Sequence, residues 1–282
     1  GGHARALLDR MGPGGRLLAL DCDEAAIRAA RRALADRLAQ CRFVRGNFAD
    51  IGRLAAEEGV REVDGVVLDL GVSSPQIDQA ERGFSFLRDG PLDMRMDRRQ
   101  TLTAAALVNE MDEADLAALI RRLGEEPAAR RIARALVRER QAGAIETTGR
   151  LAAVVARAVG GRGARLHPAT RTFQALRMAV NRELESLAAG LEGALALLRT
   201  GGRLAALSYH SLEDGCVKRT GREHAGRWVS LEAGGARWEG LQPRVRWITR
   251  KPLTPAAEER NANPRSRSAK LRIMERISDA YG

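Results

Sequence analysis

An apolar run that ends on a carboxylate is the feature that most constrains the fold of this chain. Val66, Val67 and Leu68 lead directly into Asp69, and a turn rich in glycine, serine and proline follows. Open α/β sheets build ligand sites in this way, with an acid at the C-terminal end of a buried strand beside a polar loop. Because a carboxylate there is costly unless it meets solvent or a polar ligand, we predict that Asp69 lies in a binding site.

The first part of the chain alternates strand patterns with helix patterns. Strands are expected over 16–20, 42–45 and 63–70, and helices over 24–38 and 51–58. Strands separated by helices of this length indicate βαβ units and a parallel sheet. The sequence therefore predicts an α/β fold.

The middle of the chain carries helix patterns without strand patterns. Helices are expected near 113–123, 127–140, 149–159 and 168–198. So much helix between two strands exceeds what one crossover connection needs. We therefore predict an all-helical domain inserted over 102–199.

The α/β domain would then comprise residues 1–101 and 200–282. In its second part we expect a strand over 203–208, a short helix, a mobile glycine-rich loop over 221–240 and a final strand over 270–274.

The helix predicted over 168–198 has an apolar face and a polar face. The apolar face comprises Phe173, Leu176, Val180, Leu184 and Leu187, and the polar face comprises His167, Arg171, Gln174, Arg177 and Asn181. The basic members of the polar face form a stripe suited to nucleic-acid phosphates. A solvated helix face is the alternative explanation of such a stripe.

Composition limits the partners of the chain. The net charge of +11 favours a polyanion such as nucleic acid, although an arginine-rich genome would also produce it. The three cysteines are scattered and form no CxxC pair, which indicates reduced cytosolic thiols and argues against a metal site. No apolar stretch approaches the ~18 residues of a membrane span. We therefore expect a cytoplasmic protein without a metal or a membrane partner, and a homodimer stays open.

The start of the chain has a pattern typical of nucleotide-binding folds. Gly1, Gly2 and His3 open a helix, and Asp21 ends the next strand. Glycines let the backbone approach a nucleotide, and an acid about twenty residues later accepts hydrogen bonds from ribose hydroxyls. The alternative role for Asp21 is to cap the helix that begins near Glu24.

Four separated stretches resemble the RsmH (MraW) methyltransferase family, in the order in which the family has them. These stretches are GGHARALLDRMGPGGRLLALDCD, LDLGVSSPQIDQAERGFSFLRDGPLDMRMD, HPATRTFQALRMAVNRELE, and SYHSLED with NPRSRSAKLR. The family transfers a methyl group from S-adenosylmethionine to the N4 amine of a cytidine in 16S rRNA of the small ribosomal subunit. The resemblance implies a class I (Rossmann-like) S-adenosylmethionine-dependent methyltransferase sheet with an inserted helical domain, and a role in tuning the decoding centre.

The resemblance also implies site residues. The cofactor-binding positions of the family fall on Gly1, Gly2, His3, Asp21, Phe48, Asp69 and Gln76. Phe48 would offer a flat surface to adenine, with a place in the hydrophobic core as its alternative role. We expect RNA contacts from His167, Arg171, Arg177, His210, Arg265 and Arg267.

Methyl transfer to an exocyclic amine depends mainly on proximity and orientation. The amine must be desolvated and its hydrogens must be accepted by oxygen atoms. Asp69 and the turn that contains Ser73 and Ser74 are the candidate catalytic groups. The loop over 82–97 mixes large apolar residues with arginines and acids, so we expect it to cover the cofactor or RNA, shaped by Arg-to-Asp pairs.

The chain departs from the family pattern at its start and after SLED. Gly215 and Cys216 follow SLED where the family has Arg and an apolar residue. The family also has a few dozen residues, including the central strand, ahead of Gly1. We therefore expect this chain alone to be poorly stable and to bind its cofactor weakly.

Other functions stay open at this point. The chain could methylate another RNA, DNA, a protein or a small molecule, or it could be a non-catalytic RNA-binding factor of ribosome assembly. An NAD-dependent dehydrogenase would also use an acid at a strand end, but it needs a substrate acid or base that the sequence does not offer.

Overall fold

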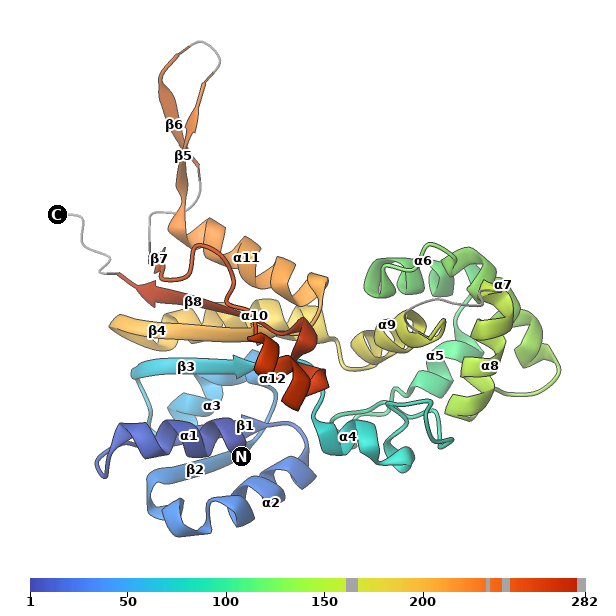
Figure 1. Ribbon diagram of the computed structural model, residues 1–282, viewed down its shortest axis with the longest axis horizontal. Helices are drawn as coiled ribbons and strands as arrows, with labels where there is room; N and C mark the ends of the chain where they lie inside the picture. Colours follow the sequence, from blue (N-terminus) through green and yellow to red (C-terminus); the bar gives the residue numbers. More distant parts are fainter. Residues whose placement is uncertain (161–166, 232–233, 240–243, 278–282) are drawn as a thin grey trace. The chain divides into compact units, whose positions relative to one another are not determined.

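The computed structural model describes residues 1–160, 167–231, 234–239 and 244–277, and it forms two compact units (Figure 1). The first unit comprises Gly1–Gly71 and Leu184–Gly282, and the second comprises Val72–Glu183. These bounds differ from the predicted insertion over 102–199.

The difference has two physical causes. The loop before residue 102 bonds within the second unit, since Leu92 N donates to Glu146 O at 2.8 Å and Ala105 N of that unit donates to Leu92 O at 2.8 Å. At the other end, the helix that follows Glu183 buries Leu187 and Leu191 in the core of the first unit.

The strands of the first unit form two main sheets. In one, β1 (Leu17–Asp21) pairs in parallel with β2 (Cys41–Arg45). In the other the order is β3-β4-β8-β7, with β3 (Val63–Asp69) parallel to β4 (Leu198–Ser208). Within the described residues no strand pairing joins β1 to β3.

Two antiparallel strands complete the larger sheet. They are β8 (Lys270–Arg276), which pairs with β4, and β7 (Val245–Trp247), which pairs with β8. The strands predicted near both ends of the chain are thus present, and the parallel pairings confirm the α/β prediction.

Helices accompany these sheets in the first unit. They are α1 (Gly2–Met11), α2 (Glu24–Ala33), α3 (Ile51–Glu57), α10 (Glu183–Leu197), α11 (Ser211–Ala225) and α12 (Ala257–Ala262). Of these, α3, α10 and α11 contribute to the main core of the unit. Leu68, Leu191, Leu204 and Met274 pack in one buried cluster that draws on β3, α10, β4 and β8. The helix predicted over 24–38 ends at Ala33 and continues as a 3-10 turn, Ala35–Gln40.

The prediction of a mobile loop over 221–240 is wrong for the described residues. Helix α11 extends to Ala225, and β5 (Arg227–Ser230) then pairs with β6 (Ala236–Glu239) as an antiparallel hairpin. The glycine content of the segment obscured the short strand patterns on each side of the turn. Residues 232–233 and 240 lie outside the described residues.

The second unit consists of helices packed on one another. They are α4 (Ser74–Asp78), α5 (Ala104–Glu110), α6 (Glu113–Gly124), α7 (Ala129–Gln141), α8 (Thr148–Val159) and α9 (Thr170–Val180). Leu116, Ile120 and Leu123 of α6 are buried at helical spacing, so hydrophobic burial fixes the face that packs inward. In the described part of the chain, no helix is long and apolar enough to cross a membrane.

The prediction of a single helix over 168–198 is also wrong. The helical segment is interrupted at Arg182, whose φ of 49° lies in the left-handed region. The Asn181 side chain donates to Arg177 O at 2.8 Å and to Met94 O at 2.8 Å, so it ends α9 by binding backbone carbonyls. Leu184 and Leu187 consequently belong to α10 and to the first unit, not to the apolar face of α9.

Candidate functional site

Asp69 lies at the tip of β3 with both carboxylate oxygens engaged. Oδ1 accepts a hydrogen bond from the Tyr209 hydroxyl at 3.0 Å, and Oδ2 lies 3.0 Å from Nδ1 of His3. The Asp69 side chain is 46% exposed, so the carboxylate faces solvent as the sequence predicted.

Three elements bring these residues together. Asp69 pairs in register with Leu207 of β4, and the chain passes from β4 into Tyr209. His3 lies in the first turn of α1, whose N-terminus therefore meets the tip of β3. The positive end of a helix dipole favours a carboxylate in that place. In Figure 1 the C-terminal ends of β1 and β3 lie on the same side of the first unit, beside the start of α1.

Tyr209 is a neutral hydrogen-bond donor in this arrangement. Burial of the phenol raises its pKa, and the negative charge of Asp69 raises the pKa further. The phenol consequently keeps its proton well above neutral pH, and it can hold Asp69 in one orientation. From its place directly after the strand predicted over 203–208, Tyr209 is expected to border the substrate, and its bond to Asp69 was not predicted.

His210 caps α11. Its Nδ1 accepts a hydrogen bond from Glu213 N at 3.4 Å, and the buried Glu213 carboxylate accepts one from Tyr209 N at 2.8 Å. The His210 side chain is 13% exposed. This cap positions Tyr209, whereas the predicted RNA contact of His210 stays a prediction.

Asp21 ends β1 and is not the cap of α2. Its Oδ1 accepts from Asp23 N at 2.8 Å, and Asp23 then caps α2 by accepting from Ala25 N at 2.9 Å. The structure thus gives the capping role to Asp23, two residues beyond the acid at the strand end.

Phe48 is half-buried and packs against the core of the first unit. A Cβ added at Gly190 of α10 would overlap its ring, so glycine at 190 is what makes room for Phe48. These contacts fit the core role. A cofactor contact from the rest of the ring stays a prediction.

Ser73, Ser74 and Gln76 belong to the second unit. Ser73 and Gln76 form a capping box at the start of α4: Gln76 N donates to Ser73 Oγ at 3.4 Å, and Gln76 Oε1 accepts from Ser73 N at 3.0 Å. Gln76 is 6% exposed, while both serines are exposed. The Ser-x-x-Gln spacing was a signal for this cap that the sequence analysis did not use.

Three members of the predicted polar face of α9 form bonds within the protein, and the RNA contact of Arg177 stays a prediction. Arg177 donates from Nε and Nη2 to the two carboxylate oxygens of Glu183, each at 2.8 Å. Gln174 donates to Leu123 O at 3.1 Å, and Asn181 bonds to Met94 O. These side chains satisfy neighbouring backbone and acid groups rather than forming a solvated face.

Basic residues remain exposed elsewhere. His167 and Arg171 are exposed at the start of α9, and Arg265 and Arg267 are exposed on the 3-10 turn Pro264–Ser268. These four keep the positions that a contact with RNA phosphates needs, although no contact follows from exposure alone.

The loop over 82–97 has the predicted Arg-to-Asp pairs. Arg95 donates from Nε and Nη2 to the two oxygens of Asp93, each at 2.8 Å, and Arg99 Nη2 donates to Asp97 at 2.7 Å. Leu92 is 2% exposed and Met94 is 1% exposed. Two large apolar residues of the loop are therefore buried in the second unit.

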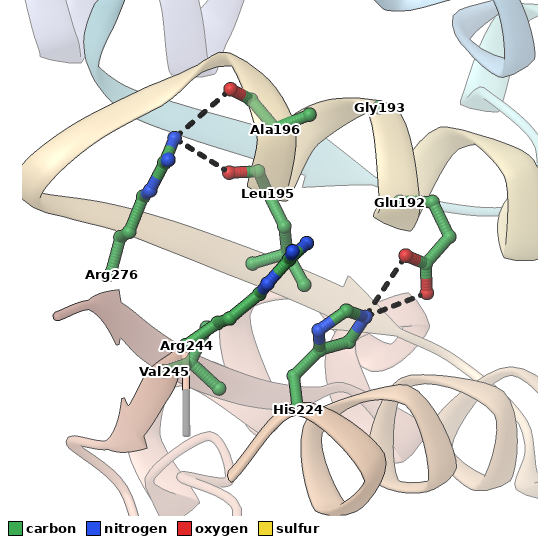
Figure 2. A pocket seen from close by; sticks show the side chains of 8 residues that line it. All are labelled: Glu192, Gly193, Leu195, Ala196, His224, Arg244, Val245 and Arg276. Carbon is green, nitrogen blue, oxygen red and sulfur yellow. Dashed lines mark hydrogen bonds and ion pairs between the residues drawn. The ribbon is translucent and has the colours of Figure 1, made fainter. Parts of the chain in front are cut away.

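A cavity of about 380 Å³ lies elsewhere in the first unit (Figure 2). Nε2 of the buried His224 lies 2.9 Å from both carboxylate oxygens of Glu192, and Arg276 donates to Ala196 O at 3.0 Å. Among the described residues, Nδ1 of His224 has no hydrogen-bond partner. The cavity contains none of the residues predicted for the site.

Comparison with known proteins gives a consistent result over the whole chain. The model of the MraW methylase family matches residues 1–277. A protein named ribosomal RNA small subunit methyltransferase H from Thermomicrobium roseum is 50% identical over 282 residues, which is 99% of this chain and 85% of the relative. A protein of the same name from a Geobacter species is 50% identical over 98% of this chain and 89% of that relative. Another, from a Cyanothece species, is 48% identical over 100% of this chain and 87% of that relative. The chain belongs to the MraW methylase family.

Proposed function

We propose that this chain transfers a methyl group from S-adenosylmethionine to the N4 amine of a cytidine in 16S rRNA, in the decoding region of the small ribosomal subunit. The relatives named as small-subunit rRNA methyltransferases support the substrate class. The N4 position rests on the resemblance of the sequence motifs alone. We also propose that the first unit is the class I methyltransferase sheet and that the second unit recognises RNA, in the cytoplasm.

The residues at the strand ends fit the cofactor in their chemistry. Asp69 keeps free acceptor capacity, because a carboxylate has about four lone-pair sites and two are used here. Among the described residues, a Cβ at Gly2 would meet nothing within 4 Å, so a ligand can approach the backbone at this position. We propose that Gly1, Gly2, His3, Asp21, Phe48, Asp69 and Gln76 hold the cofactor, which supplies an electrophilic methyl group on a sulfonium.

The residues of this chain would act mainly by orientation. Tyr209 and His3 hold the Asp69 carboxylate in place, so it does not need to reorganise when a ligand arrives. Asp69 and the turn of Ser73 and Ser74 would accept hydrogens of the target amine, so that its lone pair is directed outward. Such an amine needs no strong base, and fixed acceptors at short range are sufficient.

The observation that supports this proposal most directly is the half-exposed Asp69 carboxylate at the tip of β3, held from two sides. The test is transfer of tritium from labelled S-adenosylmethionine to small ribosomal subunits that lack the modification, followed by mapping of the labelled nucleotide. We expect label on the exocyclic amine of one cytidine.

Other results of the same experiment would contradict the proposal. Label on a different nucleotide would indicate a methyltransferase for another RNA position. Label on protein would indicate a protein methyltransferase. Absence of label together with tight RNA binding would favour a non-catalytic factor of ribosome assembly, for which the net charge of +11 is also suitable.

A further inference from the structure

Two rings of the second unit form a stacked pair at its surface. The ring centroids of Phe86 and His167 lie 4.4 Å apart with an interplanar angle of 30°. Phe173 of α9 supports Phe86 from the edge, with centroids 4.9 Å apart and an angle of 74°. Phe173 is 5% exposed, Phe86 is half-buried and His167 is exposed. The stack therefore runs from the interior of the unit to solvent.

The outer ring of this stack is held in one orientation. Nδ1 of His167 accepts a hydrogen bond from Ala169 N at 3.2 Å, and His167 O accepts one from Thr170 N at 3.0 Å. In the neutral ring Nε2 therefore carries the proton. Since Phe86 covers one face of a ring that is nonetheless exposed, the opposite face is, as far as the described residues go, open to a further planar group.

A cation lies four residues along the chain from this ring. Arg171 is 50% exposed, and its guanidinium is 3.9 Å from Glu126 Oε2, which is too long for a hydrogen bond. A planar ring with a cation nearby is the combination that binds single-stranded RNA, since bases stack on aromatic rings and cations contact the phosphates.

We propose that His167, backed by Phe86, is a stacking site for an unpaired base of the RNA substrate, an inference that rests on the proposed function. The sequence analysis gave His167 a phosphate contact. The geometry instead points to its ring as the binding group, with Arg171 as the phosphate contact. The competing explanation is that the stack only anchors the loop of Phe86 to α9.

Three substitutions at one position separate these explanations. His167→Asn removes the ring but keeps an acceptor for Ala169 N. His167→Trp keeps a stacking ring but loses that acceptor. His167→Lys supplies a charge without a ring. Arg134→Ala on α7, where the arginine is 68% exposed, is a control for the loss of one cation from the same unit.

The measurement is binding of a fluorescently labelled single-stranded RNA to the full chain, with an abasic oligomer of the same length for comparison. We expect His167→Asn and His167→Lys to weaken RNA binding about tenfold, the effect of one lost base stack. Binding of the abasic oligomer should be unchanged in His167→Asn and slightly stronger in His167→Lys, because the added cation attracts phosphates. His167→Trp should bind RNA like the wild type, and Arg134→Ala should weaken both oligomers slightly and equally. Thermal unfolding of each variant shows whether the fold is retained.

Other outcomes overturn the inference. Rescue by His167→Lys but not by His167→Trp would show a phosphate contact. If all three variants bind RNA with the affinity of the wild type, the stack only anchors the loop of Phe86 to α9. Methyl transfer is assayed separately, so a wild-type chain that binds RNA through the ring but transfers no methyl group would refute the proposed function and leave the stacking site.

Discussion

The hydroxyl of Tyr209 donates to Oδ1 of Asp69 across 3.0 Å and thereby joins the tips of β3 and β4. His3 approaches the other oxygen of the same carboxylate from α1. Asp69 is thus fixed by two elements outside its own strand, and its position depends on contacts far apart in the sequence. A carboxylate held in this way can bind a ligand without first losing its own rotamer freedom.

Replacing Tyr209 tests whether this orientation matters for the cofactor. Tyr209→Phe removes the hydroxyl and keeps the ring. We expect S-adenosylmethionine to bind about three- to tenfold more weakly. The lost hydrogen bond is to the charged Asp69 carboxylate, but this carboxylate is half-exposed, so water can partly replace the hydroxyl as a donor. Isothermal titration calorimetry measures the change.

Asp64→Asn is a suitable control for that experiment. Asp64 lies at the opposite end of β3, is 86% exposed and pairs with Arg199. Its substitution should leave the affinity for the cofactor unchanged. Equal affinities of Tyr209→Phe and wild type would show that the contact between Tyr209 and Asp69 has no part in cofactor binding.

The raised pKa of Tyr209 predicts the alkaline behaviour of the protein. Burial of the phenol and the adjacent Asp69 raise its pKa above the ordinary value of 10.0. Below that value the phenol is neutral in both the folded and the unfolded chain. As the pH rises beyond it, the unfolded chain loses the proton first, so the stability of the fold should decrease.

Ultraviolet absorbance of phenolate follows this titration directly. The chain has two tyrosines, Tyr209 and Tyr281. We expect the phenolate of Tyr209 to form only well above the ordinary pKa or when the protein unfolds in alkali. Tyr209→Phe should remove this late step. A single step near the ordinary pKa in the wild type would contradict the burial of Tyr209.

Local patterns in the sequence were sufficient to predict much of the first unit. The run from Val66 to Asp69 predicted a strand that ends on an acid in a binding site; β3 confirms the strand and the half-exposed acid at its end, and the binding site stays a prediction. Hydrophobic periodicity reports which residues a segment can bury, and this information is local. Contacts between distant segments are not, and for that reason the bond between Tyr209 and Asp69 could not be read from the sequence.

The errors have the same origin. The helical pattern through residues 168–198 is continuous, yet Arg182 takes a left-handed conformation because Asn181 bonds to Met94 of a distant loop. Arg177 also lies on the polar face of a helical wheel, but beyond the break at Arg182 the chain brings Glu183 to its guanidinium. A continuous helical pattern predicts neither the break nor this ion pair.

A substitution at Gly190 tests the place of Phe48. A Cβ there would overlap the Phe48 ring, so Gly190→Ala must displace either the ring or α10. We expect a loss of about 1–3 kcal/mol in the free energy of unfolding, as for other overpacked cores. If Phe48 contacts adenine, the affinity for S-adenosylmethionine should fall as well.

Gly215→Ala provides the matched control, because this glycine lies inside α11 and, among the described residues, its Cβ would meet nothing within 4 Å. There we expect a gain of about 0.5–1 kcal/mol from helix propensity. Urea denaturation and calorimetric titration measure both quantities. Gly190→Ala with lowered stability but unchanged cofactor affinity would assign Phe48 to the core alone.

The buried ion pair of Asp214 and Arg272 should contribute to acid sensitivity. Asp214 is 8% exposed and Arg272 is 7% exposed, and Arg272 Nε donates to Asp214 Oδ1 at 2.6 Å. Burial alone raises the pKa of this carboxyl, but Arg272 and Lys270 more than offset that effect and hold the pKa below its ordinary value of 3.8. The stability that the pair contributes is therefore present above that value and is lost as the pH falls below it.

Removal of Arg272 alone should lower the free energy of unfolding more than removal of both charges of the pair. Arg272→Met leaves Asp214 buried without its main partner, so we expect a loss of about 3–5 kcal/mol in the free energy of unfolding at neutral pH. The double variant Asp214→Asn with Arg272→Met should be more stable than Arg272→Met, because the buried carboxylate, left with only the partly exposed Lys270 as partner, is then removed. Urea denaturation of the three proteins at neutral and acidic pH tests this order. Equal stability of the single and double variants would mean that the Asp214 carboxylate finds solvent or Lys270 once Arg272 is gone, and that the pair is not an isolated buried charge pair.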